Sequence, residues 1–356
     1  MNSRKRKWSM MIASLMLLAV LSACGNDTST NQADKQANEA QSAHGSHGSH
    51  GSTSSSESKT DKSNAQTDKD KTAAVGGTFK ADEAEVAELA AQFGDKKPEK
   101  AVVVSVSISE ILHGLGVTPV GVPTSTLELP AAFKDVKRIG SAFKPDLEQI
   151  TSLEPDVVIG PASIKDSLEK TFKTASLKTA YIPSDSLEQL KLSTVVLGKV
   201  FGKEDKAKEM LDNLAKQEAE MIVKAQGKSA PKVMILFGTA ESFMMMNEKT
   251  FPGSIAAQLG ATNVVSEVLK SDETYLSLNM EDVVTANPDV ILLVSHGDPN
   301  TALKKFESDV KKNGAWEKLN AFQNGKVKAL DYNLFGVASL VKAGEAYEHM
   351  FKQLYE

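Results

Sequence analysis

Hydrophobic and polar positions change their pattern near residue 78, where short apolar runs begin to alternate with stretches of helical periodicity. The apolar residues of each run are consecutive instead of occupying every second position, which is typical of parallel strands covered on both faces. The alternation of such strands with helices favours an α/β fold. The predicted strands are residues 102–106, 157–159, 233–237 and 290–294.

One long helix divides this folded region. Residues 204–226 are amphipathic and contain neither proline nor glycine, which predicts a single uninterrupted helix. Gly227 and Pro231 follow it directly, as is typical of a helix end. A shorter helix is predicted to begin at Ser109 and to end near Gly114.

The two sides of the long helix carry a short internal repeat. Glu148 is followed seven residues later by Pro155. A Pro-Asp dipeptide begins there and leads into an apolar strand. Glu281 is followed in the same way by Pro288, and both pairs are 133 residues apart. A Pro-Asp turn into a strand is common in itself. Because the two copies lie on either side of the long helix, however, they predict two similar α/β lobes.

The N-terminus has the features of a secretory signal. Residues 4–7 are basic, residues 10–20 are apolar, and small residues precede Cys24, the only cysteine of the chain. The apolar run is too short to span a bilayer as a stable helix. The sequence Leu-Ser-Ala-Cys at 21–24 resembles the lipobox of bacterial lipoproteins. This resemblance implies that residues 1–23 are a signal peptide and that Cys24 becomes an acylated N-terminus outside the cytoplasm, anchored to the cell membrane.

Residues 24–77 contain almost no apolar side chains, which predicts a disordered tether. His44, His47 and His50 lie within it, and they are interpreted either as a weak site for a divalent metal or as incidental residues of a flexible linker. The remaining boundaries follow from the elements above. We expect an N-terminal lobe at 78–202, an inter-lobe helix at 203–228 and a C-terminal lobe at 229–356.

Charge and motifs exclude several classes of function. A net charge of −5 argues against a general nucleic-acid-binding protein, and an acylated Cys24 leaves no cysteine for a disulfide or a nucleophile. A Gly-Lys-Ser at 227–229 lacks the first glycine of a phosphate-binding loop, because that position is Ile222. No nucleophile elbow, dinucleotide fingerprint or paired-histidine zinc motif is present, so we do not expect an enzyme.

Three stretches of the sequence carry a resemblance to a known family. They are residues 121–140, residues 231–238, and residues 295–299 with the later Trp316 and 331–336. With the lipobox, tether and long helix, they resemble the substrate-binding lipoproteins of iron-complex ABC importers, and more narrowly the heme-receptor (IsdE-like) group. The resemblance implies two Rossmann-like lobes joined by one long α-helix, the class III periplasmic-binding-protein fold. It also implies a monomer that binds heme as its transported ligand. The single long helix between the lobes should resist large hinge closure, so we expect only modest movement on binding.

The resemblance implies a binding site between the lobes. That group holds heme iron between a methionine of the first lobe and a histidine of the second. The histidine falls on His296, at the carboxyl end of a predicted strand, and Tyr332 lies in the third similar stretch. The methionine position is Phe143, which cannot ligate iron. Heme would then be held by His296 alone with Phe143 against the porphyrin, or the ligand is a different complex.

Other side chains leave alternatives open. Met244, Met245 and Met246 are expected in a loop after the strand at 233–237, where they either supply a thioether or pack the cleft. His113 is interpreted as a helix-end residue. A siderophore, either a ferric hydroxamate or a catecholate, is the main alternative ligand because it brings its own iron ligands. A zinc or manganese carrier is less favoured, because His113, His296 and His349 are the only histidines of the folded region.

Glu148 and Glu281 match the positions at which this family carries one acidic residue per lobe. The resemblance implies that they bind arginines of an ABC permease, which works with its own ATPase. Two like charges, one on each lobe, would set the register of docking on a symmetric permease dimer. The alternative interpretation is that both are ordinary solvated helix glutamates.

Overall fold

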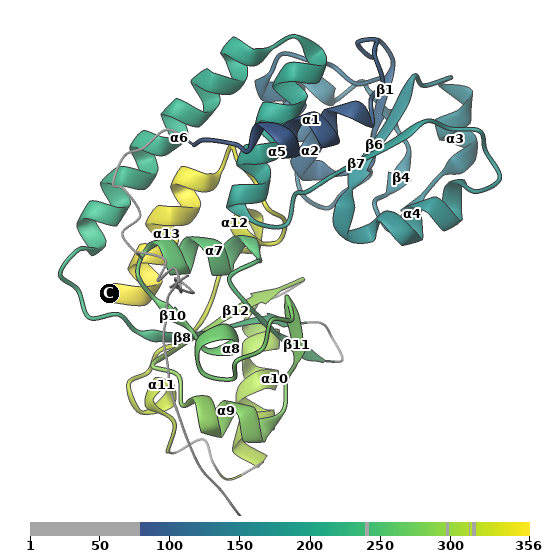
Figure 1. The fold of residues 1–356 in the computed structure, drawn as a ribbon. Helices are drawn as coiled ribbons and strands as arrows, with labels where there is room; N and C mark the ends of the chain where they lie inside the picture. The colour runs from purple at the N-terminus through teal and green to yellow at the C-terminus, as the bar shows by residue number, and fades with distance from the viewer. Residues whose placement is uncertain (1–78, 239–241, 297–298, 313, 315–317) are drawn as a thin grey trace, which may run out of the picture. The chain divides into compact units, whose positions relative to one another are not determined.

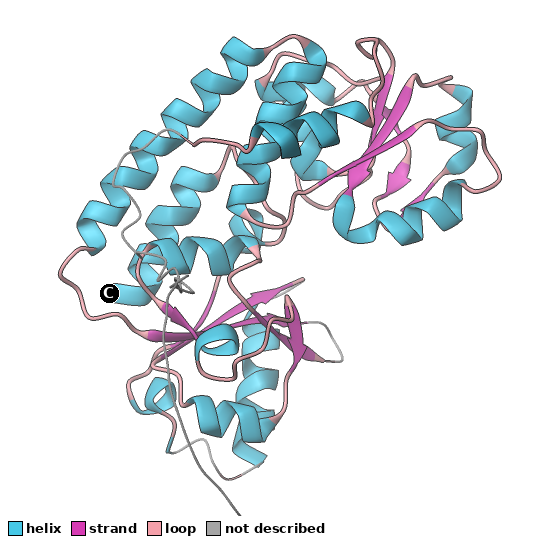
Figure 2. Ribbon diagram, in the orientation of Figure 1, coloured by secondary structure: helices cyan, strands magenta, loops and turns pink. Residues whose placement is uncertain are grey.

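The computed structural model describes residues 79–238, 242–296, 299–312, 314 and 318–356, all of which belong to one compact unit. Its elements form two α/β lobes, each built around its own sheet, with a long helix between them in sequence (Figures 1 and 2). The fold class predicted from the sequence is therefore confirmed. No helix in these ranges is both long enough and apolar enough to cross a membrane.

The sheet of the first lobe is entirely parallel, with strand order β3-β2-β1-β6-β7. Val102 of β1 pairs with Gly121 on one side and with Val158 on the other. A small antiparallel hairpin of β4 and β5 follows β3. The strands are β1 (Ala101–Val103), β2 (Gly121–Val122), β3 (Lys137–Arg138), β4 (Gly140–Ser141), β5 (Lys144–Pro145), β6 (Val157–Pro161) and β7 (Thr179–Ile182).

Helices cover both faces of this sheet, which explains its consecutive apolar residues. Val103 and Ile159 belong to a core cluster on one face, and Val102 and Val158 belong to a separate cluster on the other. The helices are α1 (Glu83–Ala91), α2 (Val106–Gly114), α3 (Leu147–Ser152), α4 (Lys165–Phe172) and α5 (Leu187–Phe201), with 3-10 turns η1 (Ala131–Phe133) and η2 (Ala162–Ile164).

The predicted boundary between the first strand and the first long helix of this lobe was wrong by three residues. The strand ends at Val103, and Ser105 is already the N-cap of α2, because its hydroxyl accepts a hydrogen bond from the Ile108 amide at 3.3 Å. The helix therefore begins at Val106 and not at Ser109. Residues 102–106 look like one strand because most of them are apolar. The strand nevertheless ends before Ser105, because serine is strongly preferred at a helix N-cap.

Helix α6 (Glu204–Ala225) is the predicted long helix, 22 residues without interruption. It begins directly after Gly202, which ends α5 in a left-handed conformation with φ of 60°. Gly227, with φ of 77°, follows its C-terminus. Its buried side chains recur with helical spacing, at Ala207, Leu211, Leu214, Glu218, Met221 and Ala225.

The sheet of the second lobe has strand order β11-β9-β8-β12-β13, with β10 pairing beside β9 on the same edge of β8. Strands β8, β10, β12 and β13 are parallel, whereas β9 and β11 are antiparallel to their neighbours. The strands are β8 (Lys232–Gly238), β9 (Phe243–Met246), β10 (Thr262–Asn263), β11 (Tyr275–Ser277), β12 (Val290–Ser295) and β13 (Val327–Ala329).

Helices also cover both faces of this second sheet. Alternate residues of β12 belong to different clusters, Leu292 to one and Leu293 to the other, where Phe306 packs from α10. The helices are α7 (Phe251–Gln258), α8 (Val264–Glu267), α9 (Met280–Ala286), α10 (Pro299–Lys312), α11 (Asn320–Gln323), α12 (Tyr332–Phe335) and α13 (Ala343–Tyr355).

Residues 244–246, which were expected to form a loop, belong to strand β9. Met244 and Met246 lie opposite Phe237 and Ile235 of β8 in an antiparallel ladder. Because side chains of a strand alternate between its faces, the methionines cannot all face one cavity. The sequence prediction of a loop at 244–246 was wrong, since three methionines pack well on a half-buried strand.

The main hydrophobic core is shared by both sheets. It contains Ile182 of β7 and Val294 of β12 together with the buried faces of α5, α6, α7 and α13. One backbone-to-side-chain bond also links the lobes, because the Leu187 amide at the start of α5 donates to the Ser254 hydroxyl of α7 at 3.3 Å. The lobes therefore share one continuous apolar layer of helices.

A polar network is buried inside this layer. Lys191 Nζ of α5 lies 2.7 Å from Glu218 Oε1 of α6 and 2.8 Å from Glu188 Oε1. The Tyr347 hydroxyl of α13 donates to Glu218 Oε1 at 3.1 Å, and it also bonds Gln258 of α7. Burial, the largest effect, raises the pKa of Glu218, while Lys191 opposes that shift. The network connects four helices through one carboxyl group.

The internal repeat is visible in the structure. In each lobe a residue with positive φ, Glu154 or Asn287, precedes the proline, and the next aspartate receives backbone hydrogen bonds. Asp156 Oδ2 accepts from the Lys100 amide at 2.9 Å, and Asp289 Oδ2 accepts from the Lys232 amide at the same distance. Each aspartate therefore fixes the start of a central strand, β1 or β8, against the start of its neighbour.

We expect Tyr347→Phe to destabilise the protein more than Tyr355→Phe. Loss of the Tyr347 hydroxyl removes a donor to a buried carboxyl, worth about 1.5–3 kcal/mol. The half-buried Tyr355 hydroxyl donates to the carbonyl of Leu259 at 2.5 Å, a neutral bond worth about 0.5–1.5 kcal/mol. Urea unfolding of both variants gives the two free energies. Equal losses would show that the bond in the buried network contributes no more than an ordinary neutral hydrogen bond.

Candidate functional site

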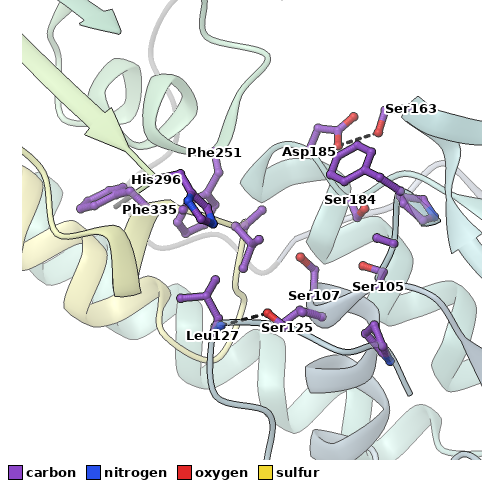
Figure 3. A pocket seen from close by; sticks show the side chains of 18 of the residues that line it. Ser105, Ser107, Ser125, Leu127, Ser163, Ser184, Asp185, Phe251, His296 and Phe335 are labelled. Carbon is purple, nitrogen blue, oxygen red and sulfur yellow. Dashed lines mark hydrogen bonds between the residues drawn. The ribbon is translucent and has the colours of Figure 1, made fainter. Parts of the chain in front are cut away.

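A cavity of about 500 Å³ is lined by residues of both lobes (Figure 3). Its walls are formed largely by the segments that follow the carboxyl ends of the parallel strands, such as Ser105 after β1, Ser184 after β7 and His296 after β12. This is where α/β folds bind ligands, and the volume lies within the range of about 300–1,000 Å³ usual for small-molecule sites. The cavity is therefore the candidate binding site.

The first lobe contributes a wall of hydroxyl groups. Ser105, Ser107 and Ser184 are each more than nine-tenths buried, and Figure 3 shows them along the right of the cavity. Ser105 caps α2, and Ser184 lies two residues before Ser186, the cap of α5. Helix starts carry free amide groups and a partial positive charge, so this wall suits the acceptor oxygens of a ligand.

Asp185 is the single acidic side chain among the described residues that line the cavity. Its Oδ1 accepts a hydrogen bond from the Ser163 hydroxyl at 3.0 Å. Burial, the largest effect, raises the pKa of Asp185, and the bond from Ser163 opposes that shift. Tyr275 of β11, from the second lobe, also lines the cavity, and its pKa is raised by burial and further by the nearby Asp185.

The second lobe contributes an aromatic wall. Phe251 begins α7, while Tyr332 and Phe335 belong to α12, and all three line the cavity. The rings of Phe251 and Phe335 lie 6.2 Å apart between centroids. Burial raises the pKa of Tyr332, which keeps its phenol neutral. An apolar ring system would replace water against this wall at a favourable free energy.

His296 belongs to the aromatic wall. It follows β12, lines the cavity and is exposed. Its ring meets that of Tyr332 edge to face, with centroids 5.3 Å apart and planes at 78°. In Figure 3 the imidazole lies beside Phe251 and Phe335 and faces the open space of the cavity. The side chain expected to bind iron is therefore free of a protein hydrogen bond partner among the described residues and available to a ligand.

Phe143 lies at the tip of the β4–β5 hairpin. The pairs Gly140–Pro145 and Ser141–Lys144 leave Ala142 and Phe143 as its two-residue turn. The Phe143 side chain is 79% exposed and lines the cavity from the first lobe. Contact between an exposed phenyl ring and water is unfavourable, and a ligand bound in the cavity can remove it by covering the ring. The structure thus brings Phe143 and His296 to the same cavity from opposite lobes.

The three methionines do not act together. Met246 lines the cavity but is 4% exposed and packs in the shared core. Met245 is fully buried in the other cluster of the second lobe, and Met244 does not line the cavity. A cleft position for Met245 is wrong because alternation turns it to the other face of β9, and Met244 shares the face of Met246 but does not line the cavity.

The cavity carries few charges. Among the described residues that line it, none is lysine or arginine. The described residues also contain no group of three or more His, Cys, Asp or Glu side chains that could hold a metal ion. The polar recognition groups on the described walls are therefore hydroxyls, one carboxyl group and one imidazole.

A second buried acid lies behind the cavity wall. Glu110 follows Ser107 by one turn of α2, is 5% exposed and hydrogen-bonds the hydroxyl of Ser339. Ser339 follows the segment 336–338 that lines the cavity from the second lobe. Burial raises the pKa of Glu110, while Ser339 and the nearby Lys342 oppose that shift. Glu110 therefore connects α2 to the second lobe beneath the cavity.

Glu148 and Glu281 occupy equivalent positions on their lobes. Each is the second residue after the N-cap of a short helix, Asp146 before α3 and Asn279 before α9. Both side chains are exposed, and neither forms an ion pair with another described residue. The repeat in the sequence therefore corresponds to a repeat in structure.

The other expected residues lie away from the cavity or outside the described ranges. His113 contacts Phe133 with ring centroids 5.5 Å apart, and His349 packs beside Phe335 on α13, where burial lowers its pKa. Cys24, the tether and its histidines His44, His47 and His50 are outside the described residues, as is Trp316.

Sequence reasoning missed most of the hydroxyl wall. Ser105, Ser184 and Asp185 were not among the expected site residues, although each lies within three residues of a strand end. The carboxyl-end rule for parallel strands could not select them, because Ser105 fell inside the predicted strand 102–106 and β7, which precedes Ser184 and Asp185, was not predicted. Phe251 and Tyr275 carry no such signal, because α7 and the antiparallel β11 were not predicted.

Comparison with known proteins identifies relatives of this chain. Residues 102–334 match the model of a family described as periplasmic binding protein. The chain is 32% identical over 259 residues to the high-affinity heme uptake system protein IsdE of Staphylococcus aureus strain Newman, covering 72% of this chain and 87% of that protein.

Solved structures give the same relationship. The crystal structure of S. aureus IsdE complexed with heme has a TM-score of 0.66 and 32% identity, covering 72% of this chain and 99% of that one. An ABC transporter substrate-binding protein from Listeria monocytogenes EGD-e has a TM-score of 0.66 and 33% identity, covering 73% of this chain and 99% of that one.

Proposed function

Because the chain belongs to the periplasmic binding protein family, we propose that it captures heme outside the cytoplasm and delivers it to an ABC permease with its ATPase. Proteins of this family bind transported substrates and are not enzymes. The similarity to a heme uptake protein over 72% of the chain supports heme as the ligand. In this proposal heme is cargo and not a resident cofactor.

The observation that carries the proposal is the position of His296 on an aromatic wall opposite a wall of hydroxyls. A neutral imidazole is a strong ligand of heme iron. The aromatic residues beside it, Phe251 and Phe335, suit the apolar face of a porphyrin. The serines of the first lobe suit its carboxylate substituents. We propose Tyr332, which contacts the His296 ring, and Phe143 as further residues that touch the porphyrin.

The charge of the cavity bears on the siderophore alternative. A ferric catecholate complex is strongly anionic, and burying it without cations is costly. The described lining has no lysine or arginine to offset that charge. A neutral ferric hydroxamate meets no such penalty, but it would leave the His296 imidazole without a role. The cavity therefore favours heme.

We further propose that Glu148 and Glu281 bind the permease and that Cys24 carries the lipid anchor. The two glutamates are exposed, unpaired among the described residues and equivalent in the two lobes. Such a pair of like charges suits cationic side chains on two permease subunits. The lipid anchor is supported by the basic and apolar sequence before Cys24.

We expect the purified protein to bind hemin with a shift of its Soret absorption band. We expect His296→Ala to weaken hemin binding at least about tenfold, because the loss of a residue that only contacts a metal ligand already weakens metal binding by about that factor. The matched control is His113→Ala, which removes an exposed histidine outside the cavity lining. Absorption titrations measure both affinities. An unchanged spectrum of the wild-type protein with hemin would reject heme as the ligand.

We expect the double substitution Glu148→Lys and Glu281→Lys to reduce heme uptake by cells while leaving hemin affinity unchanged. Reversed charges would face permease cations, and like-charge contacts cost several kcal/mol. Glu220→Lys, an exposed glutamate of α6, serves as the control for a general change of charge. Normal uptake by the double variant would remove the docking assignment.

We expect Cys24→Ser to move the protein from the membrane fraction to the medium or soluble fraction. Serine offers no thiol for acylation, so the variant loses the two or three acyl chains that hold a soluble domain at the bilayer. Fractionation followed by immunodetection measures the distribution. Retention of the variant in the membrane at the wild-type level would show that another segment provides the anchor.

A further inference from the structure

The side chains able to ligate heme iron lie on one wall of the cavity. Imidazole, thioether and phenolate groups are the usual protein ligands of this iron besides thiolate. Among the described residues that line the cavity, all those of these types come from elements of the second lobe. They are His296 after β12, Met246 in β9, Tyr275 in β11 and Tyr332 in α12.

The described part of the first lobe supplies no such group to the cavity. Its described lining residues are serines, threonines, prolines, aliphatic side chains, Phe143 and Asp185. Asp185 is already an acceptor for Ser163, and burial favours its neutral form, which is a poor metal ligand. Two ligands of one heme iron must approach from opposite faces of the porphyrin. A porphyrin lying between the two walls can therefore take a protein ligand from the second lobe only.

Within the second lobe, three of the four candidates are unsuited. The Tyr332 ring is in direct edge contact with His296, which leaves no room for a porphyrin between them, so both lie on the same side of it. Met246 is almost fully buried in the core. Tyr275 lies in β11 of the same lobe as His296, so it adds no ligand from the first lobe, and burial together with the nearby Asp185 keeps its phenol neutral. His296 remains.

We propose that heme in this cavity has one protein ligand, His296, and that the opposite position of its iron accepts a small exogenous ligand such as imidazole or cyanide. The inference rests on the proposed function. Binding forms one coordinate bond from the lone pair of the incoming ligand to the iron. Any water held there leaves, and the oxidation state of the iron does not change.

The hairpin of β4 and β5 decides access to that open position. Phe143 at its tip is 79% exposed, and a two-residue turn on strands of two residues each makes few contacts with the core. A phenyl ring there shields the iron from bulk water without bonding to it. Small ligands can reach the iron past such a tip, whereas a ligating side chain at the same position would compete with them.

The test uses the full-length chain with His44, His47 and His50 changed to alanine, so that no tether histidine reaches the iron. After hemin loading and removal of free hemin, imidazole is titrated while absorption and electron paramagnetic resonance spectra are recorded. We expect a high-spin ferric spectrum that converts to low-spin with one imidazole per heme. In His296→Ala the conversion should require two imidazoles per heme.

Substitutions at the hairpin tip test the open side directly. Phe143→Met should give a low-spin spectrum before imidazole is added and should raise the imidazole concentration for half conversion at least about tenfold. Phe143→Leu, apolar and unable to ligate, should stay high-spin before imidazole is added, which separates a new ligand from a change of side-chain shape. An unchanged response of Phe143→Met would overturn the position of the open side beneath the hairpin.

Two failures are distinguishable. If the chain takes up no hemin, the proposed function fails and this inference fails with it. If the chain takes up hemin but the complex is low-spin from the start and does not respond to imidazole or cyanide, the heme assignment stands. The iron then has a second protein ligand, and the open position is rejected.

Discussion

The buried ion pair between Lys191 and Glu218 fixes the helices on which both cavity walls depend. Its two charges would be costly to bury alone, and Tyr347 and Glu188 complete their hydrogen bonds. Helix α5 begins directly after Ser184 and Asp185, and α7 begins at Phe251. One network therefore holds the helices that begin beside part of the hydroxyl wall and part of the aromatic wall.

The two walls have different chemistry because different elements form them. Strand ends of the first lobe run into helices capped by serine, which places hydroxyls and amide groups at the cavity. The second lobe presents α7, α12 and the end of β12, whose side chains at the cavity are mainly aromatic. A flat ligand with apolar faces and anionic edges fits between walls of this kind, and recognition needs no lysine or arginine from the described lining.

The α/β class and the long helix were predictable, since consecutive apolar residues and an uninterrupted amphipathic stretch have few other solutions. His296 and Phe143 were found through family resemblance combined with position. The errors came from local chemistry that overrides periodicity. Ser105 ends a strand by capping a helix, and β9 turns a methionine run into a ladder with alternating faces. Asp185 and Tyr275 approach each other through tertiary structure alone, which no local pattern encodes.

The shared hydrophobic core restricts where this protein can diverge. A substitution on the buried face of α5 must suit partners in both lobes, because α6, α7 and α13 pack in the same cluster. The turn at Ala142 and Phe143 lies outside this cluster, so a substitution there need not suit partners in both lobes. A substitution at Phe143 changes the side chain that the hairpin presents to the cavity and leaves the core packing unchanged. The chemistry of the cavity can therefore change by a single substitution at this turn, while the scaffold around it stays constant.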